Sequence, residues 1–285
     1  MEKLITKIKD FNELVMFQHS IFSLPFIFIA MVVAANGWFG WYLTFMGILA
    51  ALSARNFAMG FNRYLDRDID AKNPRTINRP SVDGRVSANQ MLIFTIANAL
   101  IFIIVAYFVN DLALYLSIPI LVIIGSYSYF KRFSYLAHII LGISLGLAPI
   151  AGVVAVSETI TLWSVLLCFG VLFWVAGFDL LYSLQDMEVD IELGLHSIPS
   201  KFGAQKTMLF SKVMHTLTVV FWLLFVLVAD LGLYAYTAVI ISAVMLSYEH
   251  YLVNKDFTKI DRAFFTVNGY LGIIFFIFIV LDVAL

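Results

Sequence analysis

Long apolar runs separated by short polar connections dominate the chain. Nine of these runs approach the ~20 residues that a helix needs to cross the hydrocarbon core of a bilayer. They lie at 14–36, 41–62, 91–109, 112–130, 136–156, 161–182, 208–229, 232–252 and 262–284. Within each run the apolar residues are continuous rather than alternating, which is typical of transmembrane helices. The pattern predicts an all-α, polytopic membrane bundle of nine transmembrane helices.

The composition supports a membrane protein and excludes several other classes. Hydrophobic residues make up 62% of the 285 positions and charged residues only 13%, against about 25% charged in soluble domains. The single cysteine, Cys168, lies in an apolar run, so a disulfide framework or a cysteine-based metal site within the chain is excluded. With a net charge of -1, the chain gives no indication of nucleic acid as a partner. We also expect no obligate protein partner.

The basic residues predict the topology. Every second connection lacks Lys and Arg, whereas the N-terminus and the remaining connections hold nearly all of them. The positive-inside rule then places the N-terminus in the cytoplasm and the C-terminus outside. Residues 1–285 read as one integral-membrane domain with two cytoplasmic cap loops at about 63–90 and 183–207. A bacterial inner membrane is the expected location.

Each predicted cap loop begins with a row of polar residues at steps of four. The first row is Asn62, Asp66 and Asp70, and the second is Tyr182, Asp186 and Asp190. Residues four apart share a helix face. Each row therefore presents its oxygen atoms along one edge, where the chain leaves an apolar span.

Two carboxylate rows of this kind suit a divalent cation and a phosphorylated substrate. Mg²⁺ prefers oxygen ligands and typically binds one or two carboxylates together with substrate phosphates. The metal and nearby cations would stabilise the charge that grows on a departing diphosphate, and aromatic side chains would stabilise an allylic cation. The candidate cations near the rows are Arg63, Arg67, Arg75, Arg79, Lys131, Arg132 and Lys201.

Three further residues are candidates for substrate binding. Arg55 lies two helical turns before Asn62 on the same helix face, roughly 10 Å deeper in the span. A charge there faces the bundle interior or a wet cavity. It could anchor an anionic substrate or serve as a structural arginine. Asp179, in the sixth span, could orient a substrate hydroxyl or pair with Arg55. His19, near the start of the first span, could reach a substrate or bond to its neighbours.

Two other function classes use similar residues. Phosphatidyl transfer from a CDP-alcohol also needs intramembrane carboxylates and a divalent metal, but its Asp-Gly-x-x-Ala-Arg opening is missing here. A transporter could use Arg55 and Asp179 as ion or substrate ligands. The acidic rows, however, lie at one predicted membrane face rather than at the midplane.

The motifs resemble those of the UbiA superfamily of intramembrane aromatic prenyltransferases over essentially the whole chain. Asn62, Asp66 and Asp70, followed by RTINRP, match the first family motif, and Tyr182, Asp186 and Asp190, followed by GLHSIPSKFG, match the second. The resemblance implies a nine-helix bundle, a capped central cavity, a lipid-side opening for the polyprenyl tail and dependence on Mg²⁺. By analogy, Asn62 and the four aspartates hold magnesium and diphosphate, with Lys131 and Arg132 nearby.

Within the superfamily the chain looks most like 4-hydroxybenzoate polyprenyltransferases. The stretches MFQHSIFSLPF and FDLLYSLQDMEVDIELGLHSIP resemble the branch linked to menaquinone made through futalosine. The implied reaction joins a polyprenyl diphosphate to a ring carbon of 4-hydroxybenzoate or a dihydroxynaphthoate, for ubiquinone or menaquinone synthesis. One departure is RPSVDGRVS, where relatives often have RPLPSGRVS, so details of that loop are open.

Overall fold

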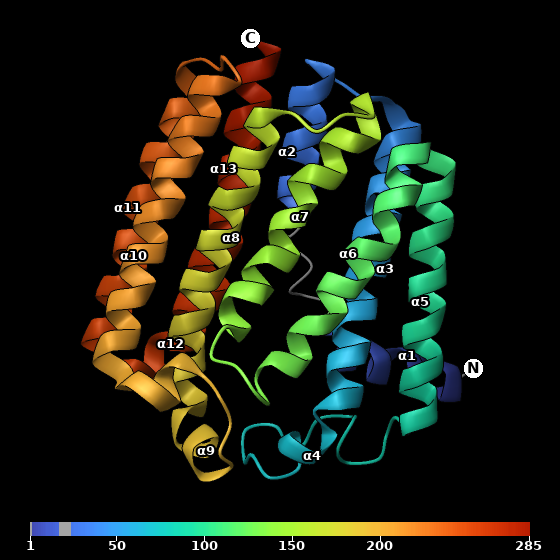
Figure 1. Cartoon of the computed structure of the whole chain (residues 1–285), viewed down its shortest axis with the longest axis vertical. Coiled ribbons are helices and arrows are strands. Elements are labelled where there is room, and N and C mark those ends of the chain that lie inside the picture. The colour runs from blue at the N-terminus through green and yellow to red at the C-terminus, as the bar shows by residue number, and fades with distance from the viewer. Residues whose placement is uncertain (1, 17–23) are drawn as a thin grey trace.

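The structure, a computed structural model, describes residues 2–16 and 24–285, and every regular element in these ranges is helical (Figure 1). The longer helices run side by side along the tall axis of the molecule. They are α2 (Leu24–Ala35), α3 (Gly40–Leu65), α5 (Ala88–Val109), α6 (Asp111–Phe130), α7 (Ala137–Ser157), α8 (Leu162–Tyr182), α10 (Ile198–Val228), α11 (Leu233–Lys255) and α13 (Asn268–Ala284). The predicted all-helical membrane bundle is confirmed.

Eight helices of the described chain are long and apolar enough to cross a membrane. The ninth predicted span, 14–36, overlaps residues 17–23, which lie outside the described residues. Its described parts are the end of α1 (Glu2–Leu14) and the short apolar helix α2. Apart from the start of α10, the other predicted spans match helices closely, because the length of an apolar run is read directly from the sequence.

Two helical regions differ from the predicted boundaries. Helix α10 begins at Ile198, well before residue 208, because the side chain of Ser197 accepts a hydrogen bond from the Ser200 amide and caps a polar first turn. Gly203, at φ 75°, then kinks the helix. The predicted cap loop 183–207 therefore shortens to a 3-10 turn (Ser183–Asp186), α9 (Met187–Glu192) and a brief connection. Before α13, the chain forms α12 (Ile260–Arg262) and a π-helical turn, Ala263–Val267.

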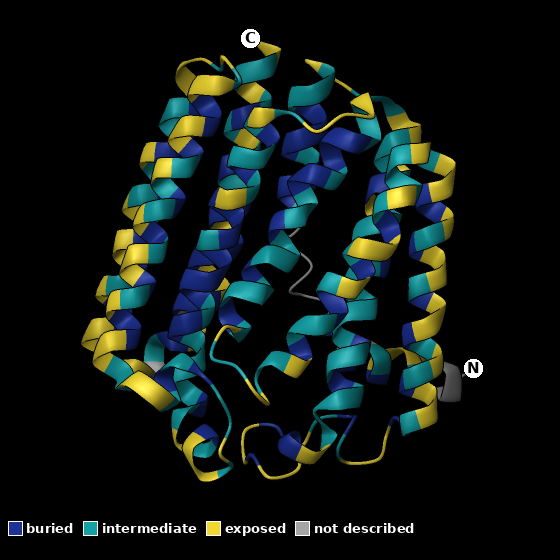
Figure 2. Cartoon of the chain, viewed as in Figure 1, coloured by how far each residue is buried: buried dark blue, intermediate teal, exposed yellow. Residues whose placement is uncertain are grey.

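The core of the bundle surrounds α8, the most buried of the long helices (Figure 2). Trp174 of α8 packs against Phe26 and Trp222, with ring centroids 5.1 and 6.1 Å away. Gly142 lets α7 approach α8 so closely that a Cβ there would lie 2.4 Å from the Leu172 carbonyl oxygen. Since lipid is as apolar as these side chains, such close van der Waals packing holds the helices together.

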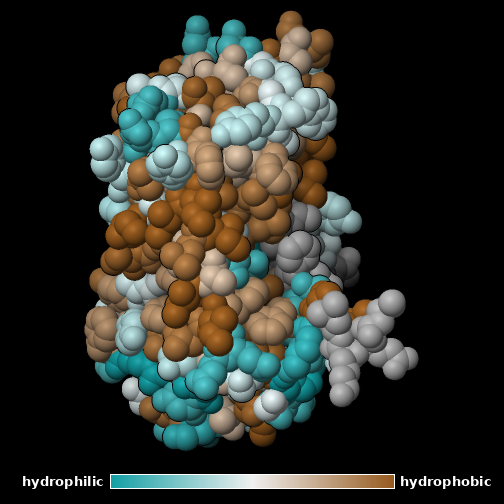
Figure 3. Space-filling model, turned by 90° about the vertical axis from the view of Figure 1, so that its right-hand side faces the viewer, coloured by the Kyte–Doolittle hydropathy of each residue, from teal (hydrophilic) through white to brown (hydrophobic). Residues whose placement is uncertain are grey.

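The polar parts of the chain gather at one end of the bundle. The short helices α4 (Arg67–Asp70) and α9 lie with their loops at the end opposite the C-terminus (Figure 1). Hydrophilic residues cover this end, and hydrophobic residues form a band above it (Figure 3). Helix α1 is tied to the first loop by Arg85, whose guanidinium contacts Glu13 at 2.6 Å and Asp83 at 2.7 Å. This end holds both acidic rows.

Candidate active site

The first acidic row keeps its helical alignment although one helix ends and another begins within it. Helix α3 ends at Leu65, Asp66 is its C-cap, and α4 starts at Arg67, so the row continues along nearly one helix. The Asn62 side-chain amide donates to Asp66 Oδ2 at 2.7 Å. Arg79, from the following loop, donates to Asp70 Oδ1 at 2.7 Å. The row is therefore fixed by both its own amide and a loop cation.

The second row follows the end of α8 through the 3-10 turn into α9. The first loop contacts this row directly: Asn73 donates to Asp186 Oδ1 at 2.8 Å, and Arg75 Nε donates to the same oxygen at 3.0 Å. Arg75 also donates to the Tyr182 hydroxyl at 3.0 Å. Lys131, at the end of α6, lies 2.7 Å from Asp190 Oδ1. Side chains from distant parts of the sequence thus join the two rows.

Both rows line one pocket with a volume of about 210 Å³. Of the residues predicted for the site, those in its lining are Asn62, Arg63, Asp66, Asp70, Arg75, Arg79, Lys131, Asp179, Tyr182, Asp186 and Asp190. Among these, Arg63 is buried and donates to Asn62 Oδ1 at 3.1 Å. The expected convergence of the two rows is therefore present in the fold.

Other predicted residues lie elsewhere. The Arg67 guanidinium sits 4.3 Å from the ring centroid of Tyr64, outside the pocket lining. Arg132 is also outside that lining and contacts Asp68 at 2.7 Å, although it comes within 3.7 Å of Asp66. Lys201 lies over the Tyr135 ring. His19 belongs to the stretch outside the described residues.

The buried carboxylates of the pocket fit a cation. Desolvation raises the pKa of Asp66 to about 6, and the nearby Asp70 charge adds to the rise, against the effect of Lys131, Arg132 and Arg63. Asp66 Oδ1, Asp70 Oδ2 and Asp190 Oδ2 are buried without a hydrogen-bond partner among the described residues. Within that same part of the chain, no three His, Cys, Asp or Glu side chains are grouped to hold a metal. Both rows instead line the same pocket, as suits metal bound together with diphosphate oxygens.

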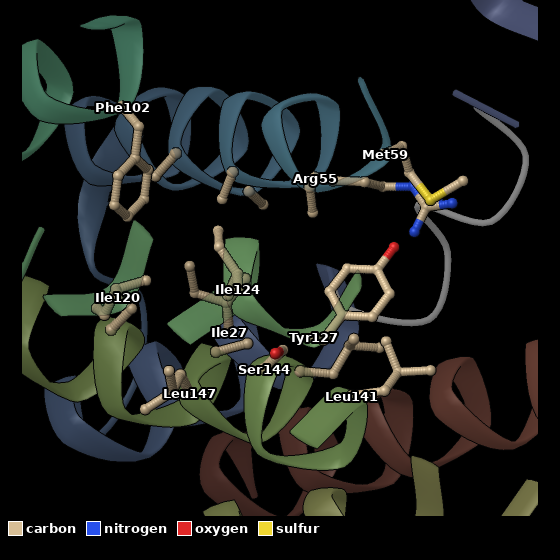
Figure 4. Close-up of a pocket in the computed structure, with 17 residues that line it drawn as sticks. Ile27, Arg55, Met59, Phe102, Ile120, Ile124, Tyr127, Leu141, Ser144 and Leu147 are labelled. Atoms are coloured by element: carbon tan, nitrogen blue, oxygen red, sulfur yellow. The ribbon is translucent and has the colours of Figure 1, made fainter. Parts of the chain in front are cut away.

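A second, apolar cavity of about 130 Å³ adjoins the acidic pocket. Tyr127 and Leu141 line both. Arg55 is the charged residue of the apolar cavity, and the Tyr127 hydroxyl points toward its guanidinium (Figure 4). Arg55 Nη2 donates to the Met16 carbonyl at 3.2 Å. The carboxylate of Asp179 contacts His138, so the suggested pairing of Asp179 with Arg55 is not the arrangement found.

Two polar residues of the acidic pocket, Asn73 and His138, were not among the predicted site residues, although each contacts an aspartate there. Asn73 lies three residues after Asp70, so its helical spacing from the first row was a usable signal. His138 offered no such signal, because its partner Asp179 is 41 residues away on another helix.

Comparison with known proteins now adds to this geometry. The sequence profile described as the UbiA prenyltransferase family matches residues 23–280. The chain belongs to the UbiA prenyltransferase family. It is therefore a prenyltransferase, and its two acidic rows are the two motifs on which the family resemblance rests. Family membership also favours prenyl transfer over the CDP-alcohol and transporter alternatives.

Relatives in this family include curated enzymes. The chain is 29% identical to a 4-hydroxybenzoate octaprenyltransferase of Herminiimonas arsenicoxydans over 255 residues, 89% of each chain. It is 27% identical to a 4-hydroxybenzoate octaprenyltransferase of Salmonella paratyphi B over 221 residues, 76% of this chain and 74% of the relative.

Solved structures of UbiA homologues share the fold. The apo structure of a homologue from Aeropyrum pernix K1 superposes with a TM-score of 0.84 at 31% identity, covering 93% of this chain and 98% of the other. A homologue from Archaeoglobus fulgidus, solved bound to GPP and Mg²⁺, has a TM-score of 0.79 at 17% identity, covering 97% of this chain and all of the other. At 17% identity, the similarity to the Archaeoglobus fulgidus homologue shows a shared fold alone.

Proposed function

We propose that this prenyltransferase moves a polyprenyl group from its diphosphate to a ring carbon of a hydroxylated aromatic acid, in a reaction that depends on Mg²⁺. The observation that carries the proposal is that two acidic rows and several arginine and lysine side chains meet in one pocket. An apolar cavity lined in part by Arg55 lies next to this pocket. The names of the curated relatives support 4-hydroxybenzoate as the acceptor. A dihydroxynaphthoate, for menaquinone, is the second candidate.

The acidic pocket is the proposed diphosphate site. Asn62, Asp66, Asp70, Asp186 and Asp190 would hold Mg²⁺, partly through diphosphate oxygens. The metal, when bound, would neutralise charge on the leaving diphosphate. Arg75, Arg79 and Lys131 are paired with these carboxylates. They are long enough to exchange a carboxylate for a phosphate oxygen, and so to stabilise the leaving group further.

The junction of the two cavities is the proposed place for the acceptor. Arg55 bonds to neutral backbone carbonyls, which an aromatic carboxylate would replace with a stronger charge-assisted hydrogen bond. The rings of Tyr127 and Tyr182 line the acidic pocket beside this place. Their faces would stabilise an allylic cation as the carbon–oxygen bond to diphosphate breaks.

The orientation in the membrane is also a proposal. The positive-inside rule puts the polar end, with both acidic rows, at the cytoplasmic face of a bacterial inner membrane. The C-terminus lies at the opposite end of the bundle (Figure 1). Accessibility of single cysteines placed at Gly84 and Leu285 to an impermeant reagent would test this, and labelling of both from one side would contradict it.

The reaction is testable with purified protein in liposomes. A polyprenyl diphosphate with 4-hydroxybenzoate or a dihydroxynaphthoate should give a product of the summed mass and free diphosphate, and EDTA should stop the reaction. Asp66→Ala should abolish turnover while the protein stays folded. Asp68→Ala is the matched control, because its side chain is 62% exposed and points out of the row. Robust activity of Asp66→Ala, or no product from any hydroxylated aromatic acid, would overturn the proposal.

A further inference from the structure

A histidine and an aspartate outside the acidic rows meet at the wall of the acidic pocket. His138 is the second residue of α7, and Asp179 lies in the last turn of α8. The distance from His138 Nδ1 to Asp179 Oδ2 is 2.6 Å, and both residues line the pocket. The close approach of α7 to α8 at Gly142, one turn away from His138, holds the pair together.

The pairing fixes the role of each imidazole nitrogen. A carboxylate accepts a hydrogen bond, so Asp179 selects the tautomer of a neutral His138 with its proton on Nδ1. The lone pair then lies on Nε2. His138 is 5% exposed, and its Nε2 is buried without a hydrogen-bond partner among the described residues. This is the arrangement in which an aspartate orients a histidine to accept a proton.

The pair lies in the wall of the acidic pocket, one turn from the junction of the two proposed substrate sites. Leu141, one turn further along α7, lines both the acidic pocket and the apolar cavity, and so does Tyr127. In Figure 4, Leu141 and Tyr127 lie at the same end of the apolar cavity as Arg55. An aromatic acid anchored at Arg55 with its ring toward the diphosphate would therefore come to the part of the wall that carries His138.

We propose that His138, oriented by Asp179, removes the ring proton that aromatic prenylation must release. This inference rests on the proposed function. The ring carbon forms a bond to the allylic carbon as the bond from that carbon to the diphosphate oxygen breaks. The electron pair of the ring carbon–hydrogen bond then returns to the ring, and the proton moves to Nε2. Asp179 stabilises the resulting imidazolium, and the products are the prenylated phenol and diphosphate.

The four aspartates of the acidic rows have another role in the proposed function, because all of them would hold Mg²⁺ and diphosphate. Asp186 accepts from Asn73 and Arg75, while Asp190 is paired with Lys131. Tyr182 accepts from Arg75. The remaining competitor is the departing diphosphate, whose oxygens could take the same proton. The experiment must therefore separate loss of the ring proton from loss of the leaving group.

His138→Gln keeps a polar side chain of similar reach but removes the base. Turnover of 4-hydroxybenzoate should fall by about 10²- to 10⁴-fold. The KM for the polyprenyl diphosphate should not change. With acceptor deuterated ortho to its hydroxyl, the variant should show a primary isotope effect that the native enzyme lacks, because proton removal becomes rate-limiting. Asp179→Asn should show the same effect more weakly. His250→Gln, on a histidine outside the pocket, is the control.

The outcomes separate the two proposals. Normal turnover in His138→Gln, or reduced turnover without an isotope effect in both variants, overturns the role of His138 and leaves the diphosphate as the base. Slow hydrolysis of polyprenyl diphosphate without an acceptor needs no ring proton, so it should be unchanged in a folded His138→Gln. If the native enzyme hydrolyses the diphosphate but prenylates no hydroxylated aromatic acid, the proposed function itself fails, and the role of His138 with it.

Discussion

Two regions of the bundle bury carboxyl groups, and their surroundings differ. In the acidic pocket, aspartates lie beside arginine and lysine side chains. In a second region, which we call the α8–α13 cluster, Glu249 is 1% exposed, and Asn268 donates to it at 2.7 Å. The other members of the α8–α13 cluster are Trp174, His215 and His250.

The two regions differ in whether the hydrogen-bond partners of the carboxyl group can move to a substrate. Long cationic side chains of the pocket can move from a carboxylate to a phosphate oxygen. In the α8–α13 cluster, Asn268 accepts from the Trp174 indole at 2.7 Å while it donates to Glu249, so its amide bridges α8 and α11 from α13. A buried amide that joins three helices in this way makes one packing arrangement specific. We therefore interpret the pocket as functional and the cluster as structural.

Among the substitutions that compare these two regions, Asp186→Asn should have the largest effect. The substitution removes a carboxylate charge that Asn73 and Arg75 hold in place by hydrogen bonds. Turnover should fall about 100-fold or more, as when a group that stabilises transition-state charge is lost. Product mass in liposomes measures the effect, and circular dichroism confirms folding. Activity close to native in Asp186→Asn would contradict the interpretation that the acidic pocket is functional and the α8–α13 cluster structural.

Arg55→Met should have the next largest effect. A hydrogen bond to a charged group contributes about 1.5–3 kcal/mol, so the KM for the aromatic acid should rise by roughly 10- to 150-fold. The KM for the polyprenyl diphosphate should stay the same, because Arg55 lines the apolar cavity rather than the acidic pocket. Steady-state kinetics with each substrate varied provides the measurement. Equal rises in both KM values would instead indicate a structural role for Arg55.

Gly177→Ala should affect stability rather than chemistry. A Cβ at Gly177 would lie 2.2 Å from the His215 ring, so the α8–α13 cluster would have to shift. Overpacking of this kind costs about 1–3 kcal/mol. The melting temperature in detergent should fall, while turnover at low temperature persists. Gly272→Ala is the matched control, since its new Cβ would meet its nearest neighbour at an ordinary 3.5 Å. Equal melting temperatures would show that His215 moves freely.

Glu249→Gln should have the smallest effect. Glutamine keeps an oxygen that can accept from Asn268, so the bridge between helices survives. Turnover should stay within about threefold of native, as for substitutions that break no essential contact. If turnover instead fell as far as in Asp186→Asn, the α8–α13 cluster would have a function in the reaction, and the comparison would have to be redrawn.

The sequence predicted the helical bundle and the two rows because both depend on spacing along one chain. Apolar runs of membrane length specify the spans, and aspartates at steps of four specify a face. The start of α10 was missed for the same reason: residues 198–207 are too polar to read as a span, yet Ser197 caps a helix there.

Contacts between helices could not be read in this way. His138 and Asp179 meet because Gly142 lets α7 pack closely on α8, and Asp186 meets Asn73 because the first loop folds across to the end of α8. The sequence by itself therefore determined the membrane spans, the polar end and the residues of each acidic row. Only the tertiary structure decided which side chains face each other, because the packing of neighbouring helices, and not periodicity along any one of them, sets those distances.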